Sequence, residues 1–230
     1  MEERGSYGQF CPVAMAAELI CSRWTVLVLR EMLAGSTRFN ELRRGVPRMS
    51  PALLSKRLKE LEAAGIVAAL PGPRGVTEYR LTPAGQDLKP IIFGIGFWGQ
   101  RWVESQLSLK NLDPSLLMWD MRRNLDPRPL PPRRVTIHFE YPELPANRRH
   151  WWLVVEGSGV DLCQQDPGFE VDLNVVGPLR SLTAVWMGVR SLRQELEGGR
   201  VELLGDREVA RSMEQWLGLS PFAREPRKVA

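Results

Sequence analysis

The ten residues SPALLSKRLK at positions 50–59 combine two unlike sets of side chains. With 100° between successive residues of a helix, the leucines share one stripe, whereas small residues and lysines occupy the other side. Small residues let a helix approach a surface closely, and lysines add positive charge. That side therefore has the chemistry of a helix that enters a groove of a polyanion. The alternative is a basic, solvated face of a helical bundle.

Positive charge is concentrated around this segment. Residues 1–110 hold 15 Lys and Arg against 10 Asp and Glu, whereas residues 111–230 hold 16 against 17. The stretch 38–59 contains seven basic residues and one acid, Glu41. Clustered charge of this kind on one motif indicates a nucleic-acid footprint.

The elements that must position this helix can be predicted from spacing. Ser50 is a good N-cap, Pro51 suits the first helical position, and Gly65 suits the end of the helix. Apolar spacing predicts three preceding helices, over residues 12–20, 24–35 and 36–46. Turn residues and strand signals predict a hairpin over 65–82, and apolar spacing a long helix over 83–105.

Helix, turn, amphipathic helix and two-stranded wing form the order of a winged helix-turn-helix, whose second helix enters the major groove. The same order predicts arginines on the preceding helix and on the wing that contact phosphates. The candidate DNA-binding residues are Arg38, Asn40, Arg43, Arg44, Ser50, Pro51, Ala52, Ser55, Lys56, Arg57, Lys59 and Arg74.

A family resemblance covers approximately residues 10–107. The runs CPVAMAAELICSRWTVLVLREMLAGSTRFNELRRGVPRMSPALLSKRLKELEAAGIV and TEYRLTPAGQDL resemble the HxlR family of bacterial winged-helix regulators, relatives of the MarR group. The resemblance implies a homodimer that binds a pseudo-palindromic operator in double-stranded DNA. It also implies that the first helix and the helix over 83–105 form the dimer interface.

The three cysteines are Cys11, Cys21 and Cys163. The resemblance matches Cys11 to a cysteine near the N-terminus that some relatives use to sense oxidants or electrophiles; packing is the alternative role. Cys21 and Cys163 stand among apolar residues, and we expect both to lie in the core.

The second half of the chain has a different pattern. The proline-rich stretch NLDPRPLPPRR at 124–134 predicts a boundary or a stiff connector. Strand signals then precede helical ones, which indicates an α+β domain. The expected organisation is a mainly α winged helix-turn-helix domain at 1–110, a helical and proline-rich connector at 111–133, and an α+β domain at 134–230.

Residues of about 134–223 resemble sterol carrier protein type two domains, chiefly through the runs VWMG and VELLGDREV. That resemblance implies a sheet with helices over one face and an apolar tunnel for a hydrophobic molecule. Apolar lining with few polar groups is also usual for a small-ligand pocket. The candidate ligand-binding residues, each with the plain core as its alternative role, are Phe139, Phe169, Leu182, Trp186, Met187 and Trp216.

Several function classes find no support in the sequence. No nucleophile–histidine–acid set, phosphate-binding loop or dinucleotide fingerprint is present, so we expect no enzyme and no cofactor. Two isolated histidines, His138 and His150, and the absence of CxxC spacing predict no metal site. No apolar run is long enough to span a bilayer, and no signal pattern opens the chain, so a cytoplasmic protein without a membrane partner is expected.

The sequence thus predicts a homodimeric transcriptional regulator that binds a DNA operator through its first domain and senses a hydrophobic ligand through its second. Two alternatives remain open. One is a lipid or hydrophobic-ligand carrier without a DNA role. The other is a redox-sensing regulator that acts through Cys11.

Overall fold

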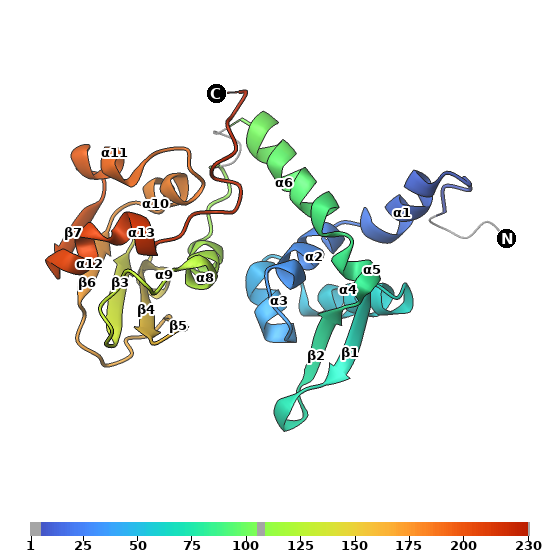
Figure 1. Cartoon of the computed structure of the whole chain (residues 1–230), viewed down its shortest axis with the longest axis horizontal. Coiled ribbons are helices and arrows are strands. Elements are labelled where there is room, and N and C mark those ends of the chain that lie inside the picture. The colour runs from blue at the N-terminus through green and yellow to red at the C-terminus, as the bar shows by residue number, and fades with distance from the viewer. Residues whose placement is uncertain (1–5, 105–108, 230) are drawn as a thin grey trace. The chain divides into compact units, whose positions relative to one another are not determined.

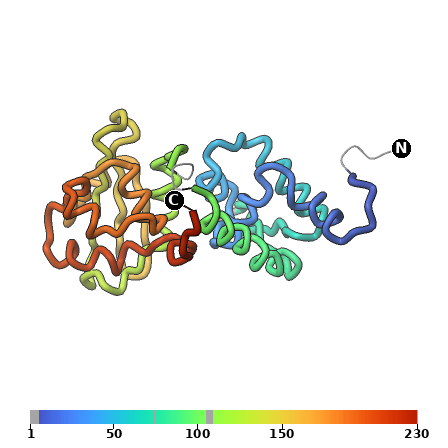
Figure 2. Tube along the Cα trace, turned by 90° about the horizontal axis from the view of Figure 1, so that it is seen from above, coloured from blue at the N-terminus to red at the C-terminus, as the bar shows by residue number. Residues whose placement is uncertain are grey.

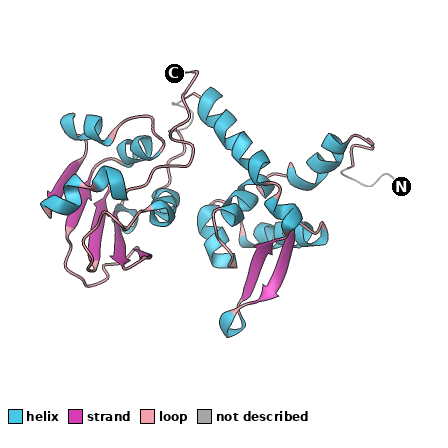
Figure 3. Ribbon diagram, in the orientation of Figure 1, coloured by secondary structure: helices cyan, strands magenta, loops and turns pink. Residues whose placement is uncertain are grey.

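The computed structural model describes residues 6–104 and 109–229, apart from the side chain of Arg74. The chain divides into two compact units, Met1–Gly96 and Phe97–Ala230, which we call the N-terminal and C-terminal units. The division falls inside the helix α6. Helices make up most of the N-terminal unit, and the larger sheet belongs to the C-terminal unit (Figures 1 and 3).

The N-terminal unit is a helix-turn-helix with a wing. Its elements can be followed along the Cα trace in Figure 2. In chain order they are α1 (Pro12–Ile20), α2 (Thr25–Leu33), α3 (Phe39–Gly45), α4 (Pro51–Ala63), β1 (Val67–Pro71), the 3₁₀ turn η1 (Pro73–Gly75), β2 (Thr77–Leu81), α5 (Pro83–Gln86) and the first part of α6 (Lys89–Trp102).

A sharp corner separates α1 from α2. Trp24, the residue before α2, has a φ of 77°, in the left-handed region that bulky side chains rarely adopt. In the described part of the chain, no single helix is long and apolar enough to cross a membrane. Together, α1 and α2 meet those criteria by length and composition, with a bend of 82° between them.

The helix expected over residues 83–105 is interrupted. The structure has a four-residue helix, α5, and then a separate helix that begins at Lys89. Pro90, in the first turn of α6, explains the break, because it has no backbone N–H to donate to the carbonyl four residues earlier and its ring would clash with that carbonyl. Gly85 belongs to the same corner: a Cβ there would lie 2.3 Å from the carbonyl oxygen of Ile66.

The C-terminal unit is an α+β structure around a five-stranded sheet. The strand order is β5-β4-β3-β6-β7, and only the β3–β6 pair is parallel. Its elements are α8 (Pro114–Asn124), β3 (Val135–Glu140), α9 (Ala146–Arg149), β4 (His150–Glu156), β5 (Gly159–Cys163), β6 (Leu173–Val176), α10 (Leu179–Trp186), α11 (Leu192–Glu197), β7 (Glu202–Gly205), α12 (Arg207–Arg211) and α13 (Met213–Trp216).

The two faces of this sheet differ because side chains alternate along each strand. On β3, Val135, Ile137 and Phe139 are fully buried in one core together with residues of α8, α10, α12 and α13. The residues between them belong to the opposite face. His138 and Glu140 are among these and are half-buried. We call this opposite side the outer face of the sheet.

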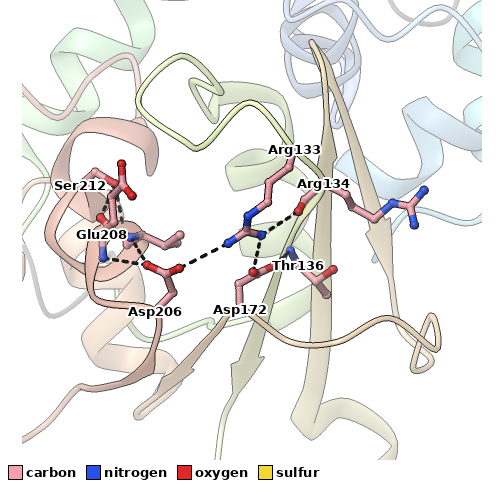
Figure 4. A network of polar contacts seen from close by, with 8 residues as sticks. Arg133, Arg134, Thr136, Asp172, Asp206, Glu208 and Ser212 are labelled. Atoms are coloured by element: carbon pink, nitrogen blue, oxygen red, sulfur yellow. Dashed lines mark hydrogen bonds and ion pairs between the residues drawn. The ribbon is translucent and has the colours of Figure 1, made fainter.

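An arginine joins residues beside the ends of three neighbouring strands, β3, β6 and β7 (Figure 4). The guanidinium of Arg133 pairs with the carboxylates of Asp172 and Asp206. The other carboxylate oxygen of Asp172 accepts the backbone N–H of Thr136 at 2.7 Å. Asp206 also accepts the N–H groups of Glu208 and Val209, so it caps α12. The network therefore fixes the start of α12 against β3 and β6.

A buried carboxylate organises the opposite end of this unit. The side chain of Glu195 in α11 has no exposed surface and pairs with Arg190 and Arg200 at 3.1 and 2.7 Å. Hydrogen bonds from Arg200, and then from Ser181 and Arg190, outweigh the effect of burial and lower the pKa of Glu195 to about 2. Breaking such a pair leaves an uncompensated buried group, which is destabilising.

We predict that Glu195→Gln lowers the free energy of unfolding at pH 7 by about 2 kcal/mol. Solvent screening limits the loss, because both arginine partners are partly exposed. Because the folded-state pKa lies below the ordinary 4.5, the wild-type advantage is full above that pH and is lost as the pH falls toward 2. Urea titrations at several pH values measure it. The matched control is Glu197→Gln on the same helix, whose exposed pair with Arg193 should contribute little. Equal losses for the two variants would contradict the assignment.

Candidate nucleic-acid interface

The helix α4 begins where the sequence predicts. The Ser50 side chain accepts the N–H of Leu53 at 3.3 Å, and Pro51 occupies the first turn. At the other end, Gly65 has a φ of 70°, and its N–H donates to the carbonyl of Glu62. Local contacts thus define both ends of the helix.

One face of α4 is buried. Leu54, Leu58 and Leu61 are at most 2% exposed and belong to the core that includes Leu29 of α2 and Leu42 of α3. The opposite side is exposed: Pro51, Ala52, Ser55, Lys56 and Lys59 occupy its first turns, and Glu60, Glu62 and Ala63 follow toward its end. Because the leucines determine which side faces inward, the small residues and the two lysines face solvent.

The three basic residues of α4 are not equivalent. Lys56 is 68% exposed and lies 3.9 Å from Glu60, a separation at which an exposed pair contributes little. Arg57 is only 17% exposed; it pairs with Glu60 and donates to the carbonyl of Arg23 at 3.3 Å. The Arg57 side chain therefore joins α4 to the corner before α2, whereas Lys56 projects outward.

The preceding helix, α3, supplies further positive charge. Arg43 and Arg44 are exposed in its last turn, where cations interact favourably with the helix dipole, and Asn40 is exposed in its first turn. Arg48, which is exposed in the turn before α4, was not among the predicted residues. Arg48 is one of the seven basic residues counted over 38–59, so that count was the sequence signal that could have identified it.

Arg38 connects α3 to the wing. Its guanidinium lies 3.6 Å from Glu78 of β2, which also pairs with Arg80 at 2.9 Å. Both arginines lower the pKa of Glu78, and Arg80 has the larger effect; burial acts in the opposite direction. The N–H of Tyr79 donates to the carbonyl of Thr37 at 2.7 Å. The wing is therefore fixed to α3, while the side chain of Arg74 at its tip lies outside the described residues.

The cysteines differ from the prediction in part. Cys11 is half-buried at the N-terminus of α1, where hydrogen bonds from the backbone of Ala14 and Val13 lower the pKa of its thiol. Cys21 is exposed, so its predicted place in the core is wrong; it follows the last turn of α1, outside the packed face. Cys163 is half-buried at the end of β5 and lines a surface pocket, so its predicted place in the core is also wrong; burial raises the pKa of its thiol.

The candidate ligand-binding residues lie in two environments. Phe139, Leu182, Trp186 and Trp216 are buried in the C-terminal core, against which Met187 packs. Phe169 lies in the loop before β6, is 40% exposed, and carries the guanidinium of Arg134 over its ring at 4.2 Å. The structure therefore brings five of the six together and leaves Phe169 outside.

Two described surface pockets in the C-terminal unit involve other residues. One, of about 530 Å³, lies between the proline-rich segment 127–134 and the turn at 155–158. The other, of about 660 Å³, is lined by Asn147, Cys163, Gln164 and Gln165. Neither includes any of the six candidates.

Comparisons with known proteins concern the N-terminal part of the chain. Residues 19–107 match the family described as HxlR-like helix-turn-helix. The HTH-type transcriptional regulator YvaP of Bacillus subtilis is 36% identical over 42% of this chain and 92% of its own length. The HTH-type regulator sll1512 of Synechocystis is 32% identical, over 43% of this chain and 75% of its own.

Among solved structures, the reduced form of the transcriptional regulator YodB of B. subtilis is 30% identical over 40% of this chain and 93% of its own, with a TM-score of 0.36. The identity with YvaP extends over nearly the whole of that regulator. The residues that match the family, 19–107, include α3, α4 and the wing. The chain belongs to the family of HxlR-like helix-turn-helix regulators.

Proposed function

We propose that the protein is a homodimeric transcriptional regulator that places α4 in the major groove of an operator. The observation that carries this proposal is the division of α4 into a buried leucine face and an exposed face of small residues and lysines. A major groove about 12 Å wide admits one α-helix when its outward residues near the N-terminus are small. Pro51, Ala52 and Ser55 meet that requirement.

Base contacts and phosphate contacts fall to different residues. Ser55, Lys56 and Lys59 are on the exposed face of α4 and within reach of base edges or the adjacent backbone. Arg43 and Arg44, at the end of α3, suit phosphates beside the groove. Arg38 and Arg57 already bind Glu78 and Glu60, so their proposed role is to hold the wing and α4 in place.

An exposed apolar stripe supports the dimer. Ile91, Ile95, Trp98 and Trp102 follow helical spacing on one side of α6 and are between 48% and 62% exposed. Val13 and Leu19 of α1 are also more than half exposed. Contiguous exposed apolar residues mark interaction surfaces. A two-fold dimer would set two copies of α4 one helical turn of DNA apart.

A second candidate function is redox sensing through Cys11. The supporting observation is its position: a partly accessible thiol, with two backbone N–H groups lowering its pKa. A lower pKa raises the thiolate fraction at neutral pH, and the thiolate is the reactive form. Attack of that thiolate on hydrogen peroxide gives a sulfenic acid and hydroxide.

Ligand sensing by residues 134–223 stays a prediction, as does their resemblance to sterol carrier domains. It draws support from the α+β fold of the C-terminal unit. A ligand there would act on the operator only through its difference in affinity between two conformations of the dimer.

For the DNA interface, we predict that Lys56→Ala weakens binding to the operator duplex by about 1–3 kcal/mol if Lys56 contacts a base edge. Fluorescence anisotropy with a labelled duplex measures it. Lys110→Ala, which removes the same charge from an exposed position outside the interface, is the matched control. With about four phosphates per subunit, the wild-type dimer should show a log–log salt slope of roughly −7. A flat slope would instead support the carrier alternative.

For the dimer, we predict that Ile95→Asp converts the protein to monomers, because a carboxylate in the stripe would be buried without a partner. Analytical ultracentrifugation at a fixed concentration measures the change. Leu70→Asp on β1, a comparably exposed apolar position, should leave the mass unchanged. A dimeric Ile95→Asp protein would place the interface elsewhere.

For Cys11, we predict that hydrogen peroxide changes operator binding by the wild type and that Cys11→Ser abolishes this response without altering binding under reducing conditions. Cys163→Ser, whose thiol has a raised pKa, should respond as the wild type does. If Cys11→Ser still responds to peroxide, Cys11 is not the sensor.

A further inference from the structure

The chain contains two histidines, and the fold brings them together on the outer face of the C-terminal sheet. His138 lies on β3 and His150 at the start of β4. Their nearest ring nitrogens, Nε2 of His138 and Nδ1 of His150, are 3.1 Å apart. Trp152 stacks on His138 with ring centroids 4.8 Å apart. Both histidines are half-buried, so the pair is accessible from solvent.

A chain of hydrogen bonds determines which nitrogens carry protons. The side-chain N–H₂ of Asn174 on β6 donates to the carbonyl of Leu204 at 3.5 Å, which leaves its oxygen facing His138. That oxygen lies 2.9 Å from Nδ1 of His138. With the amide in this orientation, Nδ1–H of His138 donates to the Asn174 oxygen, and Nε2 of the neutral imidazole carries the lone pair that faces His150.

This is the arrangement of a metal-binding histidine. Such residues donate one ring N–H to an oxygen acceptor, which fixes the tautomer and leaves the other nitrogen free to coordinate. Here Asn174 holds His138 with Nε2 aimed at His150, before any metal is considered. The role of Asn174 is therefore one of positioning.

We propose that His138 and His150 form a two-imidazole site for a late first-row divalent cation, Cu²⁺ or Ni²⁺. Nitrogen ligands lie about 2.0–2.1 Å from such metals, so two nitrogens 3.1 Å apart subtend roughly 100° at the cation. That angle suits neighbouring positions in tetragonal or octahedral geometry. The site lies beyond the proposed DNA-binding function and does not depend on it.

Coordination needs a small rearrangement. The two rings are inclined by only 19°, with centroids 5.2 Å apart, and their nitrogens face each other. Each ring must turn so that the two lone pairs converge on the cation beside the present hydrogen bond. His150 loses its Nδ1 proton to water and gains one on Nε2, so neutral imidazole is retained and no net proton is released.

The chemistry of the surroundings selects the metal. Among the described residues no group of three or more His, Cys, Asp or Glu is arranged around one point, so a closed structural zinc site is not available. Water must complete the coordination, and affinity at a given nitrogen site increases toward Ni²⁺ and Cu²⁺. Glu140, opposite His150 in the strand register, adds negative charge to this face.

Equilibrium dialysis of tag-free protein against Ni²⁺, with metal content measured by mass spectrometry, tests the proposal. Ni²⁺ is preferable to Cu²⁺ because it does not oxidise the three thiols. We expect one Ni²⁺ per chain, and quenching of the minor share of tryptophan emission that belongs to Trp152. His150→Ala should lose both. Asn174→Ala should bind about 10-fold or more weakly, because His138 is then free to change tautomer.

Two controls separate this site from other ligands. Cys163→Ala, which removes the thiol opposite Trp152 in the register, should bind Ni²⁺ as the wild type does. Trp152→Phe should bind Ni²⁺ with the quenching abolished. Circular dichroism verifies that each variant is folded. The proposal is overturned if wild-type protein retains no Ni²⁺, or if folded His150→Ala retains as much as the wild type.

Discussion

The burial of three leucines, Leu54, Leu58 and Leu61, is the interaction on which the N-terminal unit depends. They fill the core between α2 and α3, so α4 has one rotational setting about its axis. Rotating the helix by one residue would expose a leucine and bury a lysine, and both changes are unfavourable. The exposed face is thus a consequence of core packing. A helix whose inner face is determined in this way can present Ser55 and Lys56 without a loss of backbone conformational entropy at the moment of binding.

A second constraint concerns the wing and the proposed dimer, which would present two copies of α4 at a defined separation. Within one chain, Glu78 accepts contacts from Arg38 and Arg80, and the backbone of Tyr79 bonds to Thr37. The wing and α3 therefore move with α4 as one body. The separation between two such bodies must then be set by other elements. The exposed stripe of α6 and the apolar residues of α1 are the surfaces suited to that task.

Local signals predicted most of the fold, and contacts distant in the sequence account for what they missed. Ser50 and Pro51 define the start of α4 through neighbouring groups, so the sequence sufficed there. The break before Lys89 was missed because apolar periodicity continues across Pro90. Cys21 was misplaced because apolar neighbours in sequence need not lie beside it in space. The adjacency of His138 and His150 depends on the register of β3 and β4, in which His138 faces Trp152 and Glu140 faces His150. Spacing alone does not determine such a register.

The two faces of the C-terminal sheet impose different conditions on any ligand. On the inner face, Phe139, Leu182 and Trp216 have no exposed surface, and close-packed interiors tolerate few voids. A hydrophobic molecule could enter there only by displacing side chains that already contact one another, so its binding energy would be reduced by the packing that it replaces. On the outer face, His138, His150 and Asn174 are half-buried, and their hydrogen bonds preset one tautomer. Binding there requires ring rotation but no opening of a core. If a ligand binds the C-terminal unit without a large conformational change, binding at the outer face therefore costs less free energy than binding in the core.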